Sequence, residues 1–176
     1  GYAVPGTVIA VGVLIPFAWL DNRVDALAMA WFDTSTGLLL SGTLAALLFA
    51  YVVRFLSVSL QSVESGLARI RPALDESART LGASGFTTLR RVHLPILRGS
   101  LLTALLLVFV DVLKELPATL ILRPFNVNTL AVRTYELASD ERLVDAATPA
   151  LAIVLIGLLP VILLVRALLA GETDRG

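Results

Sequence analysis

The sequence predicts an all-α membrane protein, and composition and charge spacing support this fold class. Hydrophobic residues make up 57% of the 176 residues and charged residues 16%, whereas soluble domains are usually about 45–50% apolar and about 25% charged. Three uncharged stretches of 20 residues each end at a charged residue: Gly1–Leu20, Thr34–Val53 and Ala146–Val165. Because about 20 apolar residues in a helix span a hydrocarbon core of about 30 Å, we expect a polytopic bundle of transmembrane helices.

Other interpretations of these apolar runs fit less well. A secretory signal needs a basic region and a short apolar core near a start methionine, and the run at Gly1 has neither. One run could form a buried core helix, but three runs of this length could not. The net charge is zero and cysteine is absent, so bulk charge indicates no partner, and disulfides and cysteine metal sites are excluded. Since the chain opens inside an apolar run, we expect a fragment with at least one preceding helix.

We expect a single transmembrane domain over residues 1–176, with spans at about 1–20, 34–60, 96–115 and 146–169. The acidic segment Asp21–Asp33 is expected to be a loop between the first two spans. Arg54 lies inside the second span, near enough to its end for the side chain to reach the membrane surface.

The remaining segments differ in charge, and this predicts their sidedness. Six arginines lie in the loop 61–98, and cytoplasmic loops are enriched in lysine and arginine. That loop is therefore placed in the cytoplasm, and the segments Asp21–Asp33 and 116–145 are placed outside. A short helix is expected around Leu130–Ala138 in the second of these.

The cytoplasmic loop contains the signals of two short helices separated by a glycine. Pro72 suits the first position of a helix, and Gly82 suits a left-handed residue after its end. Ser84 can cap a second helix, which we expect Pro95 to end, with the third span following. From periodicity alone, a basic amphipathic connector lying on anionic headgroups remains an equal alternative.

The spacing within this loop favours a more specific interpretation. The pattern resembles the signature loop of permease subunits in ATP-binding-cassette (ABC) importers, which reads Glu-Ala-Ala, three residues, Gly, nine residues and Ile-x-Leu-Pro. Ser77 replaces the first alanine and Val92 the isoleucine. The matching and substituted positions are Glu76, Ser77, Ala78, Gly82, Val92, Leu94 and Pro95.

The resemblance extends over most of the chain. The opening "GYAVPGTVIAVGVLIPF" and the segment from Asp111 to Pro160 are similar to the second half of ferric-iron importer permeases. This implies the helical bundle of the type I ABC importer permease class, with cytoplasmic coupling helices in the loop 76–95. It also implies a prokaryotic plasma membrane, the inner membrane if Gram-negative, with no cofactor and no nucleic acid. The implied partners are ABC ATPase subunits, a second permease half in the same or another chain, a substrate-binding protein outside, and membrane lipid.

The resemblance implies ferric iron as the cargo, although thiamine, polyamine and phosphonate importers have similar permeases. ATP hydrolysis is expected in a partner protein, because the single lysine, Lys114, precedes Glu115 and no phosphate-binding loop is present. His93 is the only histidine, so no histidine cluster can bind a metal, and we expect it to be a solvated side chain at the interface. No catalytic residues are assigned.

Four residues near the end of the third span are candidates for the translocation path: Asp111, Lys114, Glu115 and Pro117. Asp111 and Lys114 can pair at helical spacing, whereas Glu115 would repel Asp111, giving a local charge of −1. An ordinary ion pair between helices explains these charges equally well. An intramembrane enzyme, with Asp111, Glu115 and Arg54 as acid–base groups, or an ATP-independent channel or carrier would also use such residues. Only the loop spacing distinguishes an ABC permease from these alternatives.

Overall fold

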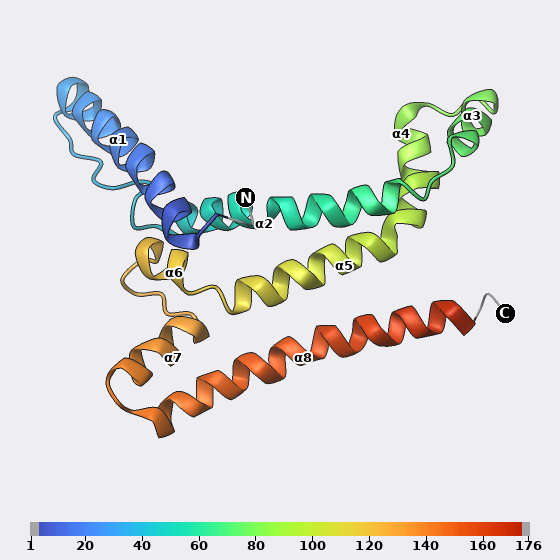
Figure 1. Ribbon diagram of the computed structural model, residues 1–176. Coiled ribbons are helices and arrows are strands. Elements are labelled where there is room, and N and C mark those ends of the chain that lie inside the picture. The colour runs from blue at the N-terminus through green and yellow to red at the C-terminus, as the bar shows by residue number, and fades with distance from the viewer. Residues whose placement is uncertain (1–3, 174–176) are drawn as a thin grey trace. The chain divides into compact units, whose positions relative to one another are not determined.

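The computed structural model describes residues 4–173 and, within them, contains helices and connecting segments without a strand. The helices are α1 (Gly6–Phe32), α2 (Leu44–Leu67), α3 (Pro72–Thr80), α4 (Gly85–Thr88), the π-helical turn η1 (Leu89–His93), α5 (Leu94–Leu113), α6 (Pro117–Leu122), α7 (Leu130–Ser139) and α8 (Leu143–Thr173) (Figure 1). Residues 1–3 of the first expected span, and the side chains of Leu164 and residues 167–176, lie outside the described part. The all-α prediction is confirmed.

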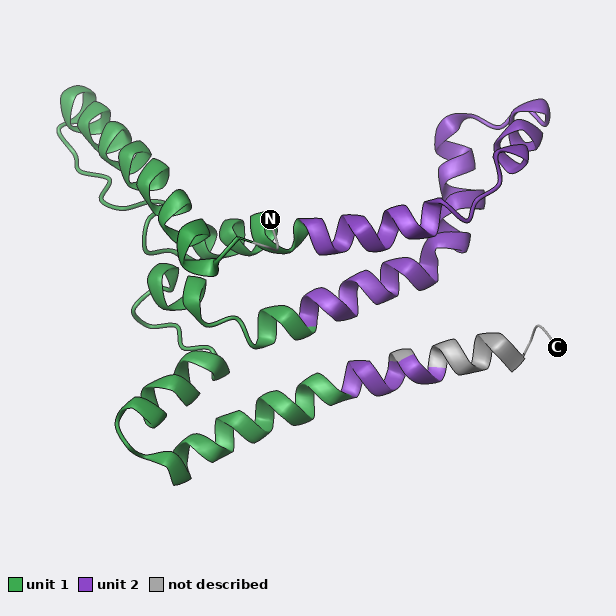
Figure 2. Cartoon of the chain, in the orientation of Figure 1, with its two compact units in different colours: residues 1–56, 110–158 green, residues 57–109, 159–176 purple. Residues whose placement is uncertain are grey.

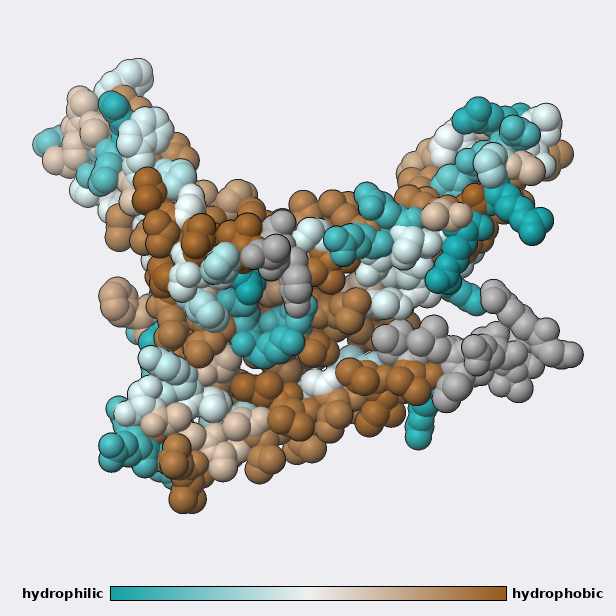
Figure 3. Space-filling model, in the orientation of Figure 1, coloured by the Kyte–Doolittle hydropathy of each residue, from teal (hydrophilic) through white to brown (hydrophobic). Residues whose placement is uncertain are grey.

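Four helical stretches of the described chain are long and apolar enough to cross a membrane: Gly6–Phe32, Leu44–Leu67, Gly85–Leu113 and Leu143–Leu163. Hydrophobic side chains cover much of their surface, as Figure 3 shows along α8. The predicted short helix at Leu130–Ala138 is also confirmed, since α7 begins after the cap residue Thr129, whose hydroxyl accepts a hydrogen bond from Val132 N.

The chain forms two compact units (Figure 2). Unit 1 comprises Gly1–Leu56 and Val110–Leu158 and contains α1, α6 and α7. Unit 2 comprises Ser57–Phe109 and Leu159–Gly176 and contains α3, α4 and η1. The helices α2, α5 and α8 contribute residues to both units.

The core of unit 1 lies where α1, α2 and α6 meet. It is formed by small and aliphatic side chains, namely Ile9, Ala10, Val13, Ala46, Leu47, Ala50, Ala118 and Leu122. Half of these residues are alanines with no exposed surface. Small side chains let helix backbones approach closely, which is how helices pack where lipid removes the hydrophobic driving force between them.

In unit 2, α2 and α5 approach closely at the base of the loop. A Cβ atom on Gly66 would lie 2.8 Å from Ser100 Cβ and 2.8 Å from Leu97 Cδ2, so only glycine fits here without movement. The two helices that border the loop therefore lie in direct contact.

The expectation of a loop at Asp21–Asp33 is wrong, because α1 continues to Phe32. The carboxylate of Asp21 accepts hydrogen bonds from the backbone of residues 39–41, at 2.7–3.2 Å. Asp25, one turn later, accepts from Thr36 N and from the Ser35 hydroxyl, both at 2.7 Å. These acidic side chains hold a connecting segment against the helix instead of ending it, so α2 begins at Leu44, ten residues later than expected.

The expectation that Pro95 ends a loop helix is also wrong, since the helix runs without a break from Gly85 to Leu113. A proline lacks the backbone N–H, and its ring clashes with the carbonyl four residues earlier. The chain widens to a π-helical turn just before the proline, with Leu94 N donating to Leu89 O. This widening accommodates the ring, as π-bulges do in other helices.

Candidate functional site

The predicted helix–glycine–helix motif is present in unit 2. Pro72 occupies the first turn of α3, and Gly82 has a φ of 77°, in the left-handed region. Gly82 N donates to Arg79 O, and Ala83 N donates to Ala78 O. These two bonds form a Schellman motif, which satisfies the free carbonyls at the end of the helix. Both the left-handed glycine and the helix boundaries predicted for α3 are confirmed.

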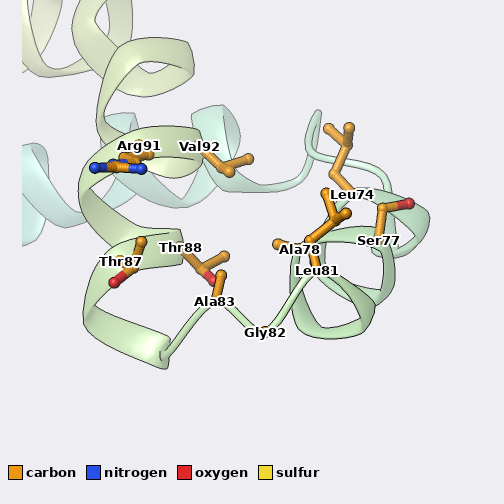
Figure 4. Close-up of a pocket in the computed structure, with 10 residues that line it drawn as sticks. All are labelled: Leu74, Ser77, Ala78, Leu81, Gly82, Ala83, Thr87, Thr88, Arg91 and Val92. Atoms are coloured by element: carbon orange, nitrogen blue, oxygen red, sulfur yellow. The ribbon is translucent and has the colours of Figure 1, made fainter.

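The second helix begins as the sequence predicts. The hydroxyl of Ser84 accepts a hydrogen bond from Thr87 N at the start of α4. Side chains of α3 face those of α4 and η1 across the turn and line an open pocket of about 520 Å³ (Figure 4). Ala78 and Thr88 are buried in this contact, each with 8% of its surface exposed. The turn therefore has a small core of its own.

A second contact ties the two arms of the motif together. His93 Nε2 lies 2.6 Å from Asp75 Oδ1, linking η1 to the first half of α3. The expectation that His93 is a solvated side chain is wrong, because it is half-buried against this carboxylate. Asp75 therefore has two roles. It holds His93 across the turn, and it lies in the first turn of α3, where a negative charge interacts favourably with the helix dipole.

Several side chains of the motif are exposed. Leu81 and Phe86, on either side of the turn, have 87% and 72% of their surfaces exposed. Glu76 is exposed on α3, and its carboxylate makes no ion pair with the residues that the structure describes. The motif thus presents two large apolar side chains and one unpaired carboxylate on a braced scaffold.

Unit 1 contains a buried charge cluster that sequence reasoning did not assemble. Arg54 Nε on α2 lies 3.0 Å from Glu115 Oε2, just after α5, and Glu115 is 5% exposed. The other carboxylate oxygen accepts a hydrogen bond from Ala118 N at 3.0 Å. Arg54 Nη1 donates to Val4 O, before α1, at 3.1 Å. The expectation that Arg54 reaches the membrane surface is therefore wrong.

Two further sets of contacts surround the Arg54–Glu115 ion pair. A Cβ atom on Gly6 would lie 2.7 Å from Glu115 Oε1 and 2.9 Å from Arg54 Nη1, so a glycine is needed where α1 passes the ion pair. The hydroxyls of Tyr51 and Thr119 lie 2.5 Å apart, and Thr119 also donates to Glu115 O. The cluster joins the start of α1 to α2 and α6 (Figure 1).

The predicted Asp111–Lys114 pair is present, with 3.1 Å between Lys114 Nζ and Asp111 Oδ1. The predicted repulsion between Asp111 and Glu115 is wrong, because α5 ends at Leu113 and Glu115 turns toward Arg54. With Arg54 included, the local charge is zero rather than −1. Pro117 takes the first position of α6. The sequence contained a signal for the Arg54–Glu115 pair, because an arginine inside an apolar span requires a counter-charge.

Among the side chains that the structure describes, no group of three or more His, Cys, Asp or Glu that could bind a metal ion is found. Residues 1–171 match the family described as the inner membrane component of binding-protein-dependent transport systems. The chain belongs to this family. It is a helical permease of the type I ABC importer class and a multi-pass plasma-membrane protein, as its resemblance to such permeases predicted.

Curated relatives of the permease are named for different cargoes. It is 28% identical over 145 residues to the Fe(3+)-transport system permease protein FbpB 2 of Haemophilus influenzae, covering 82% of this chain and 29% of that protein. It is 30% identical over 157 residues to the putative 2-aminoethylphosphonate transport system permease protein PhnV of Salmonella typhimurium, covering 89% and 53%. The permease thus spans at most about half the length of these two relatives.

Proposed function

We propose that this permease forms half of the translocation path of an ATP-driven importer and receives the movement of an ABC ATPase through the loop 76–95. The supporting observation is the braced helix–turn–helix, in which Leu81, Phe86 and the carboxylate of Glu76 are all exposed. A signal carried by a mechanical contact needs a rigid element, and the Schellman turn and the Asp75–His93 contact provide one. A lipid-binding connector would not need this bracing.

We also propose which side of the membrane each segment faces and which partners it meets. The arginine-rich loop 61–98 faces the cytoplasm and the ATPase subunits, and the segment 116–145 faces outward toward a substrate-binding protein. A second permease half, in the same or another chain, completes the path. In the path itself, Asp111 and Lys114 lie near the cargo, while Glu115 and Pro117 shape the junction between α5 and α6.

Ferric iron is the cargo we propose first, and 2-aminoethylphosphonate is the second candidate because relatives carry both names. The zero net charge of Asp111, Lys114, Glu115 and Arg54 together favours neither a cation nor an anion. Selection is therefore assigned to the binding protein that delivers the cargo.

We propose that Glu76 binds a basic or hydrogen-bond-donating group of the ATPase. We expect Glu76→Lys to abolish the stimulation of ATP hydrolysis by the loaded binding protein, because the lysine would repel a basic group and would accept no hydrogen bond from a donor. The measurement is ATP hydrolysis by the full importer in proteoliposomes, with binding protein loaded either with ferric iron or with 2-aminoethylphosphonate. Glu64→Lys is the matched control, since Glu64 is an exposed glutamate near the end of α2, outside the signature stretch. Stimulation of the Glu76→Lys complex to the wild-type level would refute the proposed role.

A further inference from the structure

We propose that Phe125, on the connection between α6 and α7 (Figure 1), anchors the substrate-binding protein to this permease, which rests on the proposed outward orientation of the segment 116–145. The Phe125 side chain is fully exposed, at 102%, and no large hydrophobic side chain in the described part of the chain is more exposed. Most of the other exposed apolar side chains lie on the membrane-spanning helices, where lipid can cover them. Phe125 lies outside these helices, so its exposure needs a different explanation.

The turn that carries Phe125 is held by its own hydrogen bonds. Val127 N donates to Pro124 O at 3.1 Å, which closes a four-residue turn with Phe125 at its second position. The Arg123 guanidinium, just before the turn, donates to Val127 O at 3.4 Å and to the side-chain oxygen of Asn128, just after the turn. The two ends of the turn are therefore tied to each other.

A single carboxylate on α7 fixes this turn to the rest of unit 1. Glu136 accepts a hydrogen bond from Arg123 Nη2 at 2.9 Å with one oxygen and from Asn128 Nδ2 at 3.2 Å with the other. The side chains of Arg123 and Glu136 are only 21% and 31% exposed, so water screens this pair less than a pair on the open surface. Leu122 and Val132, on the helices that border the connection, are buried. The Phe125 ring therefore projects from a rigid base, and a preorganised anchor loses less conformational entropy when it binds.

The surroundings of the ring fit a protein partner better than lipid. Asn126 and Asn128 are exposed close to it, and amide side chains are unfavourable in hydrocarbon. The aromatic residues enriched at membrane surfaces are Trp and Tyr, whose rings carry a polar atom that Phe lacks. Arg133 Nη1 lies 3.6 Å from Glu136 Oε2, so Glu136 is shared with Arg123 and the two arginines leave a net charge of +1. The complementary surface is an apolar pocket with a carboxylate at its rim.

Among protein partners, we assign this surface to the binding protein. It is the partner that the family description names. In the proposed importer its docking is reversible, whereas permanent subunit contacts are usually larger and more hydrophobic than one ring on a polar surface. An aromatic side chain surrounded by polar groups is typical of the core and rim of such a transient interface.

Photo-crosslinking identifies what the ring contacts. Phe125→p-benzoylphenylalanine is introduced into the full importer in proteoliposomes, and the binding protein of the importer, loaded with ferric iron or with 2-aminoethylphosphonate, is added before illumination. We expect a covalent product with the binding protein. The matched control is the same substitution at Leu155, an exposed apolar residue on the spanning helix α8, which should give no such product.

Affinity measurements test whether the contact matters for binding. Phe125→Ala should weaken the affinity of the importer for the loaded binding protein by about tenfold or more, as truncation of a hot-spot side chain does. Phe125→Leu keeps most of the apolar volume and should restore most of the affinity. Because the ring is fully exposed, neither change should disturb the fold. Both experiments are done without ATP, so they give the same result whether or not the loop 76–95 couples to the ATPase.

Two results would overturn the proposal. If position 125 gave no product with the binding protein, or gave products with lipid or a second permease half instead, the ring would belong to the membrane surface or to a permease interface. If Phe125→Ala bound the loaded binding protein as tightly as the wild type, the ring would not be an anchor.

Discussion

Glu115→Gln is expected to lower the free energy of unfolding of the permease by about 3 kcal/mol, because removing one partner leaves the other charge of a buried ion pair uncompensated. The change keeps the shape of the side chain and removes its charge, so Arg54 stays in a mostly buried site without a counter-ion. The start of α1 and the α6 turn, both tied to this pair, should loosen together. Denaturant unfolding in detergent, followed by circular dichroism, measures the change.

Asp111→Asn is the matched control for this prediction. Its partner Lys114 is 62% exposed, so the loss of that pair should cost less than about 1 kcal/mol. The double variant Arg54→Met/Glu115→Gln should recover part of the lost stability, because it removes both buried charges. If Glu115→Gln were as stable as the wild type but failed to support uptake, Glu115 would belong to the cargo path and not to the anchor.

Gly82→Val is expected to abolish stimulation of ATP hydrolysis while the permease still inserts into the membrane. A β-branched residue in the left-handed conformation costs well over 1 kcal/mol, and the Schellman turn depends on that conformation. No atom lies within 4 Å of a Cβ built on Gly82, so the effect comes from the backbone and not from a clash. ATP hydrolysis by the reconstituted importer and yield from the membrane fraction measure the two outcomes.

Gly82→Asn is the control, because it removes the glycine but keeps the left-handed conformation accessible, which asparagine tolerates. This variant should keep most of the stimulation. Equal loss in both variants would show that the turn conformation is not what the coupling requires.

The helix–turn–helix of residues 72–93 was predictable from sequence because its signals are local. Pro72, Gly82 and Ser84 each act within one turn of the helix end that they define, so the helix–turn–helix follows from their spacing alone. The apolar runs predicted the membrane helices for the same reason.

The expectations that failed depend on contacts between distant residues. Asp21 and Asp25 suggested a loop, but their partners in the segment 35–41 allow α1 to continue. Spacing placed Glu115 next to Asp111, which it was expected to repel, whereas it pairs with Arg54, 61 residues away. Helical periodicity cannot identify a partner at that separation, because it describes only neighbours on one helix.

Photo-crosslinking can show whether the turn at Gly82 contacts an ATPase subunit, as we propose. A single cysteine at Leu81, in a chain with none of its own, can carry a benzophenone label at a position that is 87% exposed. The same label at Tyr135, exposed on α7 in the segment assigned to the outside, is the control. We predict a covalent product with the ATPase subunit from Leu81 and none from Tyr135. No ATPase product from Leu81, or equal products from both positions, would contradict the proposed coupling.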